Sequence, residues 1–143
     1  MTCTDNDRDK AFGSARVSSQ RREIVSATLE LGGAFTVDEL VRAVHASDTG
    51  VGTATVYRAV SALEGSGWLE RVGVRDGSAL FARCEAGAEH HHHVVCEGCG
   101  RVEATECTVS GTSAPADGFR ITRHEVTLYG LCPECSAGES KQG

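Results

Sequence analysis

Two Cys-x-x-Cys pairs constrain the fold of this chain more than any other feature. They are Cys96-Glu97-Gly98-Cys99 and Cys132-Pro133-Glu134-Cys135. With this spacing each pair of thiolates can bind one side of a tetrahedral ion, and four thiolates leave no position open. The pattern therefore predicts one closed, structural Zn²⁺ site that also holds the chain end against the preceding sheet. A thioredoxin-like redox pair is the alternative, but it leaves the second pair unexplained.

The composition is that of a globular protein of the cytoplasm. The chain has 143 residues, of which 40% are hydrophobic and 24% charged, enough for one ordinary domain or two small ones. No apolar run approaches the roughly 18 residues of a membrane span, and the charged start from Met1 to Phe12 does not resemble a signal peptide. In a reducing compartment, seven cysteines indicate metal chemistry rather than disulfides.

Charge and metal ligands are distributed unevenly along the chain. Residues 1–83 carry 10 basic and 11 acidic side chains, whereas residues 84–143 carry 4 and 9. Five of the six histidines and six of the seven cysteines also lie from Cys84 onward. An electrically balanced first part is thus followed by an acidic part that is rich in metal ligands.

Three helices are predicted after an aperiodic arm at residues 1–15. Ser18 or Ser19 caps the first helix and Gly32-Gly33 ends it. Thr36 and Glu39 form a capping box that starts the second helix, and the third helix covers residues 53–63. Apolar residues recur at helical spacing on one face of each helix: Ile24, Ala27, Thr28 and Leu31 in the first, Val37, Leu40, Val41 and Val44 in the second, and Val56, Ala59, Val60 and Leu63 in the third.

A β-hairpin is predicted next, because Asp76-Gly77 joins two strand-like runs at residues 68–75 and 78–83. Three helices followed by a hairpin are the order of a winged helix-turn-helix, whose third helix enters the major groove of DNA while basic residues nearby bind phosphates. Singly, surface arginines often serve only solubility, and a surface tyrosine often covers a core edge. The candidate DNA contacts are Thr55, Tyr57 and Arg58 on the third helix and Arg16, Arg21 and Arg22 near the first.

Four consecutive histidines, His90 to His93, precede a Val-Val-Cys strand start. In an extended chain alternate side chains point to opposite faces, which pairs His91 with His93 and His90 with His92, so that one run can serve two metal sites. A weak, adventitious metal binder is the alternative. Further ligands are available, because Glu70 begins the hairpin, Cys84 follows it, and His124 is expected in a later strand.

These motifs resemble the ferric uptake regulator family over nearly the whole ordered chain. The resemblance rests on Gly52-Thr53-Ala54-Thr55-Val56-Tyr57-Arg58, on the histidine run with Val-Val-Cys-Glu-Gly-Cys-Gly, and on His124 with Tyr-Gly-Leu-Cys-Pro-Glu-Cys. It implies a homodimer that represses genes when metal-bound. The implied architecture is α+β, with an N-terminal winged helix followed by a small α/β dimerisation domain that contains the Cys₄ zinc site. The expected boundaries are an arm at 1–15, a DNA-binding domain at 16–84, a hinge at 85–89, a dimerisation and metal domain at 90–136, and a tail at 137–143.

Within the family, similarity to the zinc uptake regulators implies a regulatory site at Glu70, Cys84, His91 and His93. A thiolate beside imidazoles suits Zn²⁺ better than manganese or iron. An iron, nickel or peroxide sensor of the same family is the alternative.

The resemblance also implies a third metal site at His90, His92 and His124 with a glutamate from a helix of the dimerisation domain. The segment from Cys107 to Gly118 instead reads as a loop, rich in Gly, Ser, Thr and Pro. Glu106 and Glu103 are the nearest substitutes for the missing glutamate. Cys3 is expected to be an incidental thiol, and Cys107 a core residue, an oxidisable thiol or a ligand.

The sequence therefore predicts a zinc-responsive repressor that binds double-stranded operator DNA as a homodimer, with no membrane and no small-molecule substrate. A zinc hydrolase with Glu89 or Glu125 as general base is disfavoured, because the chain has no His-Glu-x-x-His helix. A protein-binding zinc ribbon would leave the third helix and the hairpin without a purpose. We do not expect an enzyme.

Overall fold

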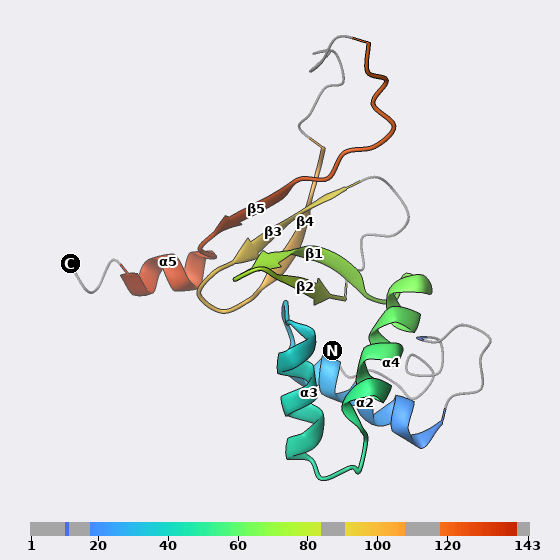
Figure 1. The fold of residues 1–143 in the computed structure, drawn as a ribbon. Coiled ribbons are helices and arrows are strands. Elements are labelled where there is room, and N and C mark those ends of the chain that lie inside the picture. Colours follow the sequence, from blue (N-terminus) through green and yellow to red (C-terminus); the bar gives the residue numbers. More distant parts are fainter. Residues whose placement is uncertain (1–10, 12–17, 84–90, 108–117, 140–143) are drawn as a thin grey trace.

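The structure, a computed structural model, describes residue 11 and residues 18–83, 91–107 and 118–139. We refer to residues 18–83 as the first half and to residues 91–139 as the second half (Figure 1). Cys3, Arg16, Cys84, Glu89 and His90 lie outside the described residues. The elements are α2 (Ser19–Leu31), α3 (Val37–Ala46), α4 (Thr53–Gly65), β1 (Glu70–Arg75), β2 (Ser78–Ala82), β3 (His92–Cys96), β4 (Val102–Thr105), β5 (Thr127–Gly130) and α5 (Pro133–Glu139).

The ends of α2 and α3 follow the capping signals in the sequence. The Ser18 hydroxyl accepts a hydrogen bond from the backbone of Arg21, and Gly32 ends α2 in the left-handed conformation (φ 72°), which glycine adopts at little cost. At α3, the Thr36 hydroxyl accepts from the Glu39 backbone at 3.3 Å, and the Glu39 carboxylate accepts from the Thr36 backbone at 2.9 Å. The predicted capping box is confirmed.

The core of the first half lies between the three helices and the start of the hairpin. All four residues predicted to face inward from α4 are buried, as are Ile24, Ala27 and Thr28 of α2. The prediction for Leu31 is wrong, since this side chain is 39% exposed. It has the right angular position, but it lies in the last turn of α2, at the edge of the core. Val25, which was not predicted, is buried.

Strands β1 and β2 form the predicted antiparallel hairpin. Asp76 and Gly77 both have positive φ (50° and 80°), as a tight hairpin turn of the I′ type requires. A bridge between Phe35 and Phe81 ties the hairpin to the turn between α2 and α3. Three helices and the β1–β2 hairpin, which we call the wing, therefore make up the first half.

The second half is a three-stranded sheet in the order β4-β3-β5, with β4 antiparallel and β5 parallel to β3. Helix α5, which the sequence reasoning did not predict, follows β5 and begins at Pro133, a residue favoured in the first turn of a helix. His124 was expected in a strand but precedes β5. No helix among the described residues is long and apolar enough to cross a membrane.

The wing packs against the edge of the second sheet through β1 and β5. A bulge interrupts the β1–β2 pairing between Arg71 and Gly73, and the Val72 carbonyl there accepts a hydrogen bond from the Thr127 hydroxyl at 2.7 Å. The backbone N–H of Val74 donates to the Tyr129 hydroxyl, also at 2.7 Å. The bulge thus turns backbone groups of the wing toward the second half.

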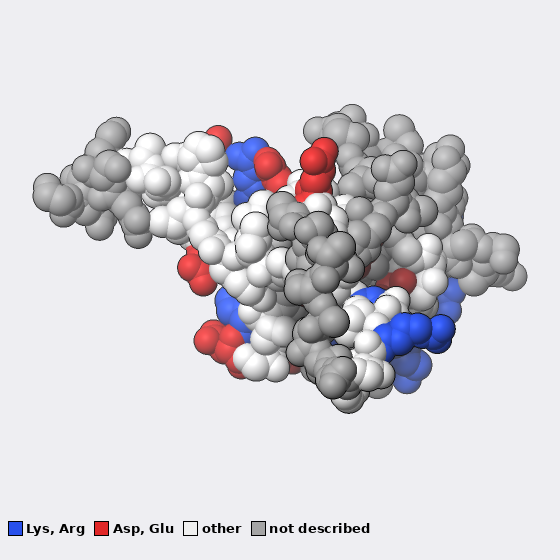
Figure 2. All heavy atoms as spheres, turned by 90° about the horizontal axis from the view of Figure 1, so that it is seen from above, with Lys and Arg blue, Asp and Glu red and all other residues white. Residues whose placement is uncertain are grey.

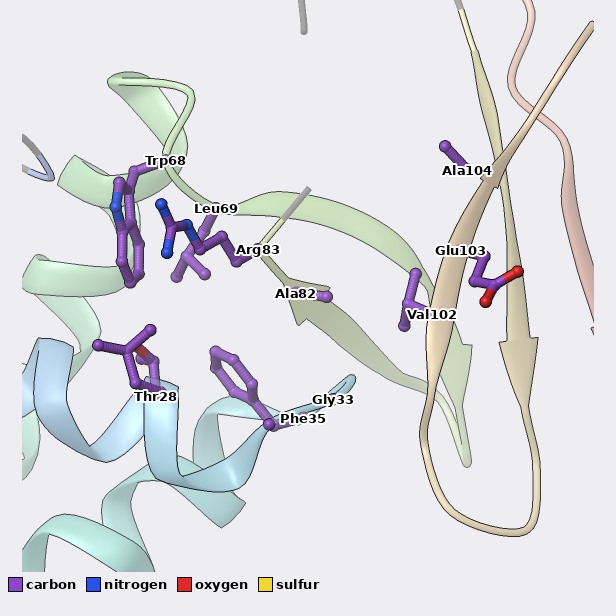
Figure 3. Close-up of a pocket in the computed structure, with 12 residues that line it drawn as sticks. Thr28, Gly33, Phe35, Trp68, Leu69, Ala82, Arg83, Val102, Glu103 and Ala104 are labelled. Atoms are coloured by element: carbon purple, nitrogen blue, oxygen red, sulfur yellow. The ribbon is translucent and has the colours of Figure 1, made fainter. Parts of the chain in front are cut away.

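A second contact joins the turn after α2 to the turn after Cys99. The Ala34 N–H donates to the Gly100 carbonyl at 2.7 Å, and a Cβ atom at Gly33 would lie 2.5 Å from the same oxygen. Only glycine permits this approach. Gly33 also lines a hollow of about 540 Å³, in which Trp68 and Phe35 face Val102 and Ala104 of β4 (Figure 3). Buried Val72, Leu80 and Ala82 of the hairpin also pack with Val95 of β3 in one apolar cluster, so the halves share a small core.

Candidate metal centres and nucleic-acid interface

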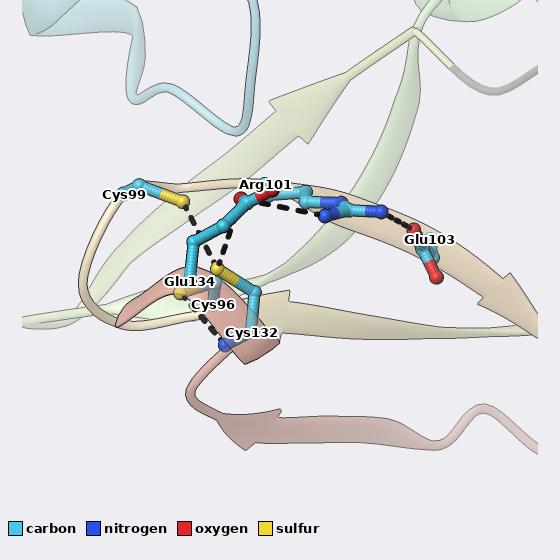
Figure 4. A network of polar contacts seen from close by, with 6 residues as sticks. All are labelled: Cys96, Cys99, Arg101, Glu103, Cys132 and Glu134. Carbon is cyan, nitrogen blue, oxygen red and sulfur yellow. Dashed lines mark hydrogen bonds and ion pairs between the residues drawn. The ribbon is translucent and has the colours of Figure 1, made fainter. Parts of the chain in front are cut away.

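The four cysteines of the two pairs come together at one end of the second sheet. Cys96 ends β3, Cys99 lies in the turn after it and Cys132 precedes α5 (Figure 4). Cys135 lies in the first turn of α5. Their sulfurs all lie within 4.8 Å of one another, and Cys99 and Cys132 are 3.8 Å apart. Two sulfurs of a tetrahedral zinc site with bonds of about 2.3 Å are about 3.8 Å apart, so this geometry fits Zn²⁺.

Backbone groups prepare one of these thiols for metal binding. The Cys132 N–H donates to the Cys96 sulfur at 3.3 Å, and this bond, with a further one from the Cys99 backbone, lowers the pKa of Cys96 to about 6. Side-chain hydrogen bonds with the other three cysteines raise the pKa of Cys135 to about 12. Close packing of the sulfurs thus disfavours further negative charge on the cluster, which a divalent cation would offset.

A second cluster bridges the two halves. Oε2 of Glu70, the first residue of β1, lies 3.2 Å from Nε2 of His91 and 3.0 Å from Nε2 of His93. The His93–Glu70 contact lacks hydrogen-bond geometry, and this His93 nitrogen is buried with no hydrogen-bond partner among the described residues. Buried polar atoms rarely lack a hydrogen-bond partner. A cation bound between the three side chains would give the His93 nitrogen a partner. The cluster therefore fits a metal ion.

Burial keeps His93 in the form that binds metal. Desolvation lowers the pKa of His93, and the opposing attraction of Glu70 does not reverse the shift. The ring is therefore neutral at pH 7 and has a lone pair for a metal ion. Cys84, the remaining ligand expected here, lies outside the described residues.

A third cluster contains His92, Cys107 and His124, whose ligand atoms also lie within 4.8 Å of one another. The Cys107 sulfur is 3.1 Å from Nε2 of His124, and the rings of His92 and His124 are 5.0 Å apart. His92 thus belongs to a different cluster from His91 and His93, as the predicted alternation requires. No carboxylate of the described residues belongs to this cluster, and Glu103 pairs with Arg101.

The candidate DNA contacts of α4 lie on its exposed side. Tyr57 is 47% exposed, and its hydroxyl donates to Asp38 of α3 at 2.9 Å, which raises the pKa of Tyr57. Arg58 donates to the Thr55 hydroxyl at 3.2 Å. Asp38, which the sequence reasoning did not single out, thus orients the tyrosine ring. Arg21 and Arg22 lie in the first turn of α2.

Figure 2 shows how charge is distributed over one face of the described residues. Acidic and basic side chains lie beside one another at the left of this view, whereas several basic side chains lie close together at the lower right.

Comparison with known proteins agrees with this arrangement. The pattern of the ferric uptake regulator family matches residues 13–129. The chain belongs to this family. Its members are metal-responsive transcription regulators that bind operator DNA as dimers, and this confirms the prediction that the chain is not an enzyme.

The relatives that this chain resembles are named for different signals. The ferric uptake regulation protein of Legionella pneumophila is 35% identical over 105 residues, 71% of this chain and 76% of that protein. The peroxide operon regulator of Bacillus subtilis is 26% identical over 129 residues, 87% of each chain. Family membership therefore fixes the class of protein and leaves the metal open.

Solved structures share the fold. A zinc uptake regulator complexed with zinc and DNA superimposes with a TM-score of 0.68 at 23% identity, over 94% of this chain and 93% of that one. A zinc-bound manganese uptake regulator gives 0.56 at 26% identity, over 89% and 97%. The predicted α+β fold, a winged helix followed by a small α/β domain, is confirmed.

Proposed function

We propose that this regulator is a repressor that responds to Zn²⁺ through a site at Glu70, Cys84, His91 and His93. The observation that carries the proposal is the convergence of Glu70 from the wing with His91 and His93 from the second half. A metal ion bound there would hold the two halves in one relative orientation. Cys84 provides a soft thiolate, and such a ligand beside imidazoles favours zinc over manganese or iron.

The Cys₄ site has a structural rather than a regulatory role in this proposal. Zn²⁺ at Cys96, Cys99, Cys132 and Cys135 has four protein ligands and no open position, so it would stabilise the second half without responding to cellular zinc. When bound at the regulatory site, Zn²⁺ supplies a cross-link between neutral imidazoles and a carboxylate.

In this proposal, operator DNA binds to α4. Tyr57, Thr55 and Arg58 would face the major groove, with Arg16, Arg21 and Arg22 on phosphates. In the second half Phe119, Ile121 and Leu128 are exposed apolar side chains, which supports a homodimer that buries them. Zinc would favour the dimer whose two α4 helices match the half-sites, and a tenfold bias needs about 1.4 kcal/mol of differential affinity. We place this action in the cytoplasm, where the operator lies.

Gel shifts on duplexes selected from a randomised pool test the proposal, with protein that keeps the structural zinc. Zn²⁺ is expected to raise the operator affinity of the wild type at least tenfold and to leave Glu70→Ala almost unchanged. Glu30→Ala, which removes an exposed glutamate of α2, is the matched control and keeps the full response. A full zinc response in Glu70→Ala would refute the regulatory site.

Iron is the second candidate signal, because the Legionella pneumophila relative at 35% identity is a ferric uptake regulation protein. Nickel and peroxide sensing remain the other family alternatives. The same gel shifts with Fe²⁺, Mn²⁺ and Ni²⁺ separate them. A larger response to any of these ions than to Zn²⁺ would overturn the choice of metal while leaving the site intact.

A further inference from the structure

The third cluster is assembled by the two strands that flank β3. Strand β4 pairs His92 with Thr105, and Cys107 follows two residues later. Strand β5 pairs Thr127 with His93, and His124 precedes it by three residues. The sheet order β4-β3-β5 therefore brings a thiol and an imidazole to the same end of β3, one from each side of the central strand.

We propose that Cys107 is a metal ligand and that His92, Cys107 and His124 form a zinc site with two nitrogen donors and one sulfur donor. This goes beyond the proposed function, since that function uses the other side of β3 and a different thiol. It also replaces the carboxylate that the family resemblance led us to expect with a thiolate.

The contacts of the described residues support sulfur rather than oxygen as the third donor. The Cys107 sulfur lies 3.1 Å from Nε2 of His124, close to the separation of about 3.5 Å between sulfur and nitrogen ligands of one tetrahedral zinc ion. Glu106 is not part of the cluster, and Glu103 pairs with Arg101. Two imidazoles and a thiolate favour Zn²⁺ over the harder ions that prefer carboxylates.

Metal binding changes the hydrogen bonding of His92. The backbone N–H of Val126 donates to Nδ1 of His92 at 3.1 Å, so in the neutral ring the proton is on Nε2. A ring that binds the ion through Nδ1 uses this lone pair, and a ring that binds through Nε2 must carry its proton on Nδ1. In both cases the Val126 N–H loses its acceptor. Occupancy of the site is therefore transmitted to the residue just before β5.

Cobalt substitution tests the assignment, because a thiolate bound to Co²⁺ gives a near-ultraviolet charge-transfer band that a carboxylate does not give. The full chain is used with its structural zinc in place and with Cys84→Ser, which removes the thiol of the regulatory site. We expect added Co²⁺ to produce the band. We expect Cys107→Ser to abolish it and to weaken zinc binding at least tenfold in competition with a chelator.

Three further variants separate a ligand from a structural role. Glu106→Gln and Cys3→Ser should keep both the band and the zinc affinity. Cys107→His should restore zinc binding without the band, which a merely structural cysteine would not do. In the Cys84→Ser protein without further substitutions, zinc should speed hydrogen exchange of the Val126 amide, because this amide loses its acceptor on His92.

The proposal is overturned if the band survives Cys107→Ser or if Glu106→Gln is the variant that loses the metal. Failure of the proposed function is a separate outcome, in which operator binding by Glu70→Ala keeps its zinc response. The band that depends on Cys107 should be unchanged in Glu70→Ala, so either assignment can fail without the other.

Discussion

The Cys₄ cluster and the Glu70 cluster use similar chemistry in different places. All four sulfurs come from the second half, at the end of β3 and the start of α5. Glu70 comes from the wing and its histidine partners from the second half. A metal at the Cys₄ cluster would have all its ligands in one half, whereas a metal at the Glu70 cluster would connect the two halves directly. In the proposed function, location more than ligand type distinguishes the structural site from the regulatory site.

The largest expected effect follows from removing a ligand of the closed site. Cys132→Ser should cost the chain its structural zinc, whose binding free energy is on the order of 10 kcal/mol in small zinc domains, and should unfold the second half. The first half keeps its own core between α2, α3 and α4 and should remain helical. Zinc content and circular dichroism measure this, with Cys3→Ser as the control. Retention of zinc by Cys132→Ser would contradict a four-thiolate site.

Mild chelation should have a smaller effect. It should remove the metal between the halves and leave the closed site filled, because four thiolates hold zinc more tightly than a mixed set. Operator binding should fall at least tenfold while the circular dichroism spectrum stays unchanged. Metal analysis before and after chelation gives the number of removable equivalents. If folding is lost together with DNA binding, the two kinds of site are not distinct.

The contact of the wing with β5 allows a test that involves no metal. Tyr129→Phe removes the acceptor of the Val74 N–H and should lower the free energy of unfolding by about 1 kcal/mol, seen in urea titrations. Tyr57→Phe is the matched control, since it removes a hydroxyl that bonds within the first half. We expect only Tyr129→Phe to loosen the halves, as faster amide exchange at Val74. Equal exchange in both variants would argue against this contact.

The smallest expected effect concerns pH. Because burial lowers the pKa of His93, the unfolded chain binds a proton at this ring more readily than the folded chain does. Stability should therefore fall as the pH drops below about 6.5, the ordinary pKa of histidine. His93→Gln should make this decline shallower in protein whose regulatory site is empty. An unchanged slope between pH 7 and 5.5 would show that His93 is not the group responsible.

Local signals account for the parts of the fold that the sequence predicts well. The capping box at Thr36, the Asp76-Gly77 turn and the helical spacing of apolar residues in α4 each act within a few residues of chain. The Cys-x-x-Cys spacing is equally local. The capping box, the turn and the buried face of α4 were found where the sequence placed them.

The features that were missed depend on distant parts of the chain. Helix α5 has the sequence PECSAGE, which has no apolar stripe, and its start coincides with the second cysteine pair. Cys107 meets His92 and His124 only because of the sheet order β4-β3-β5, and a residue count cannot supply that order. The regulatory cluster was foreseen through the family resemblance rather than through any local pattern.

Strand β3 is shared by two of the proposed sites, with His93 facing the wing and His92 facing the ends of β4 and β5. An ion bound on one side would restrain the backbone that carries the ligand of the other side. Such a restraint would give the two sites a coupling free energy, which is reciprocal by linkage. Filling either site must then change the affinity of the other by the same factor. If the coupling is favourable, the regulator's response to rising zinc would be steeper than one site per chain could produce.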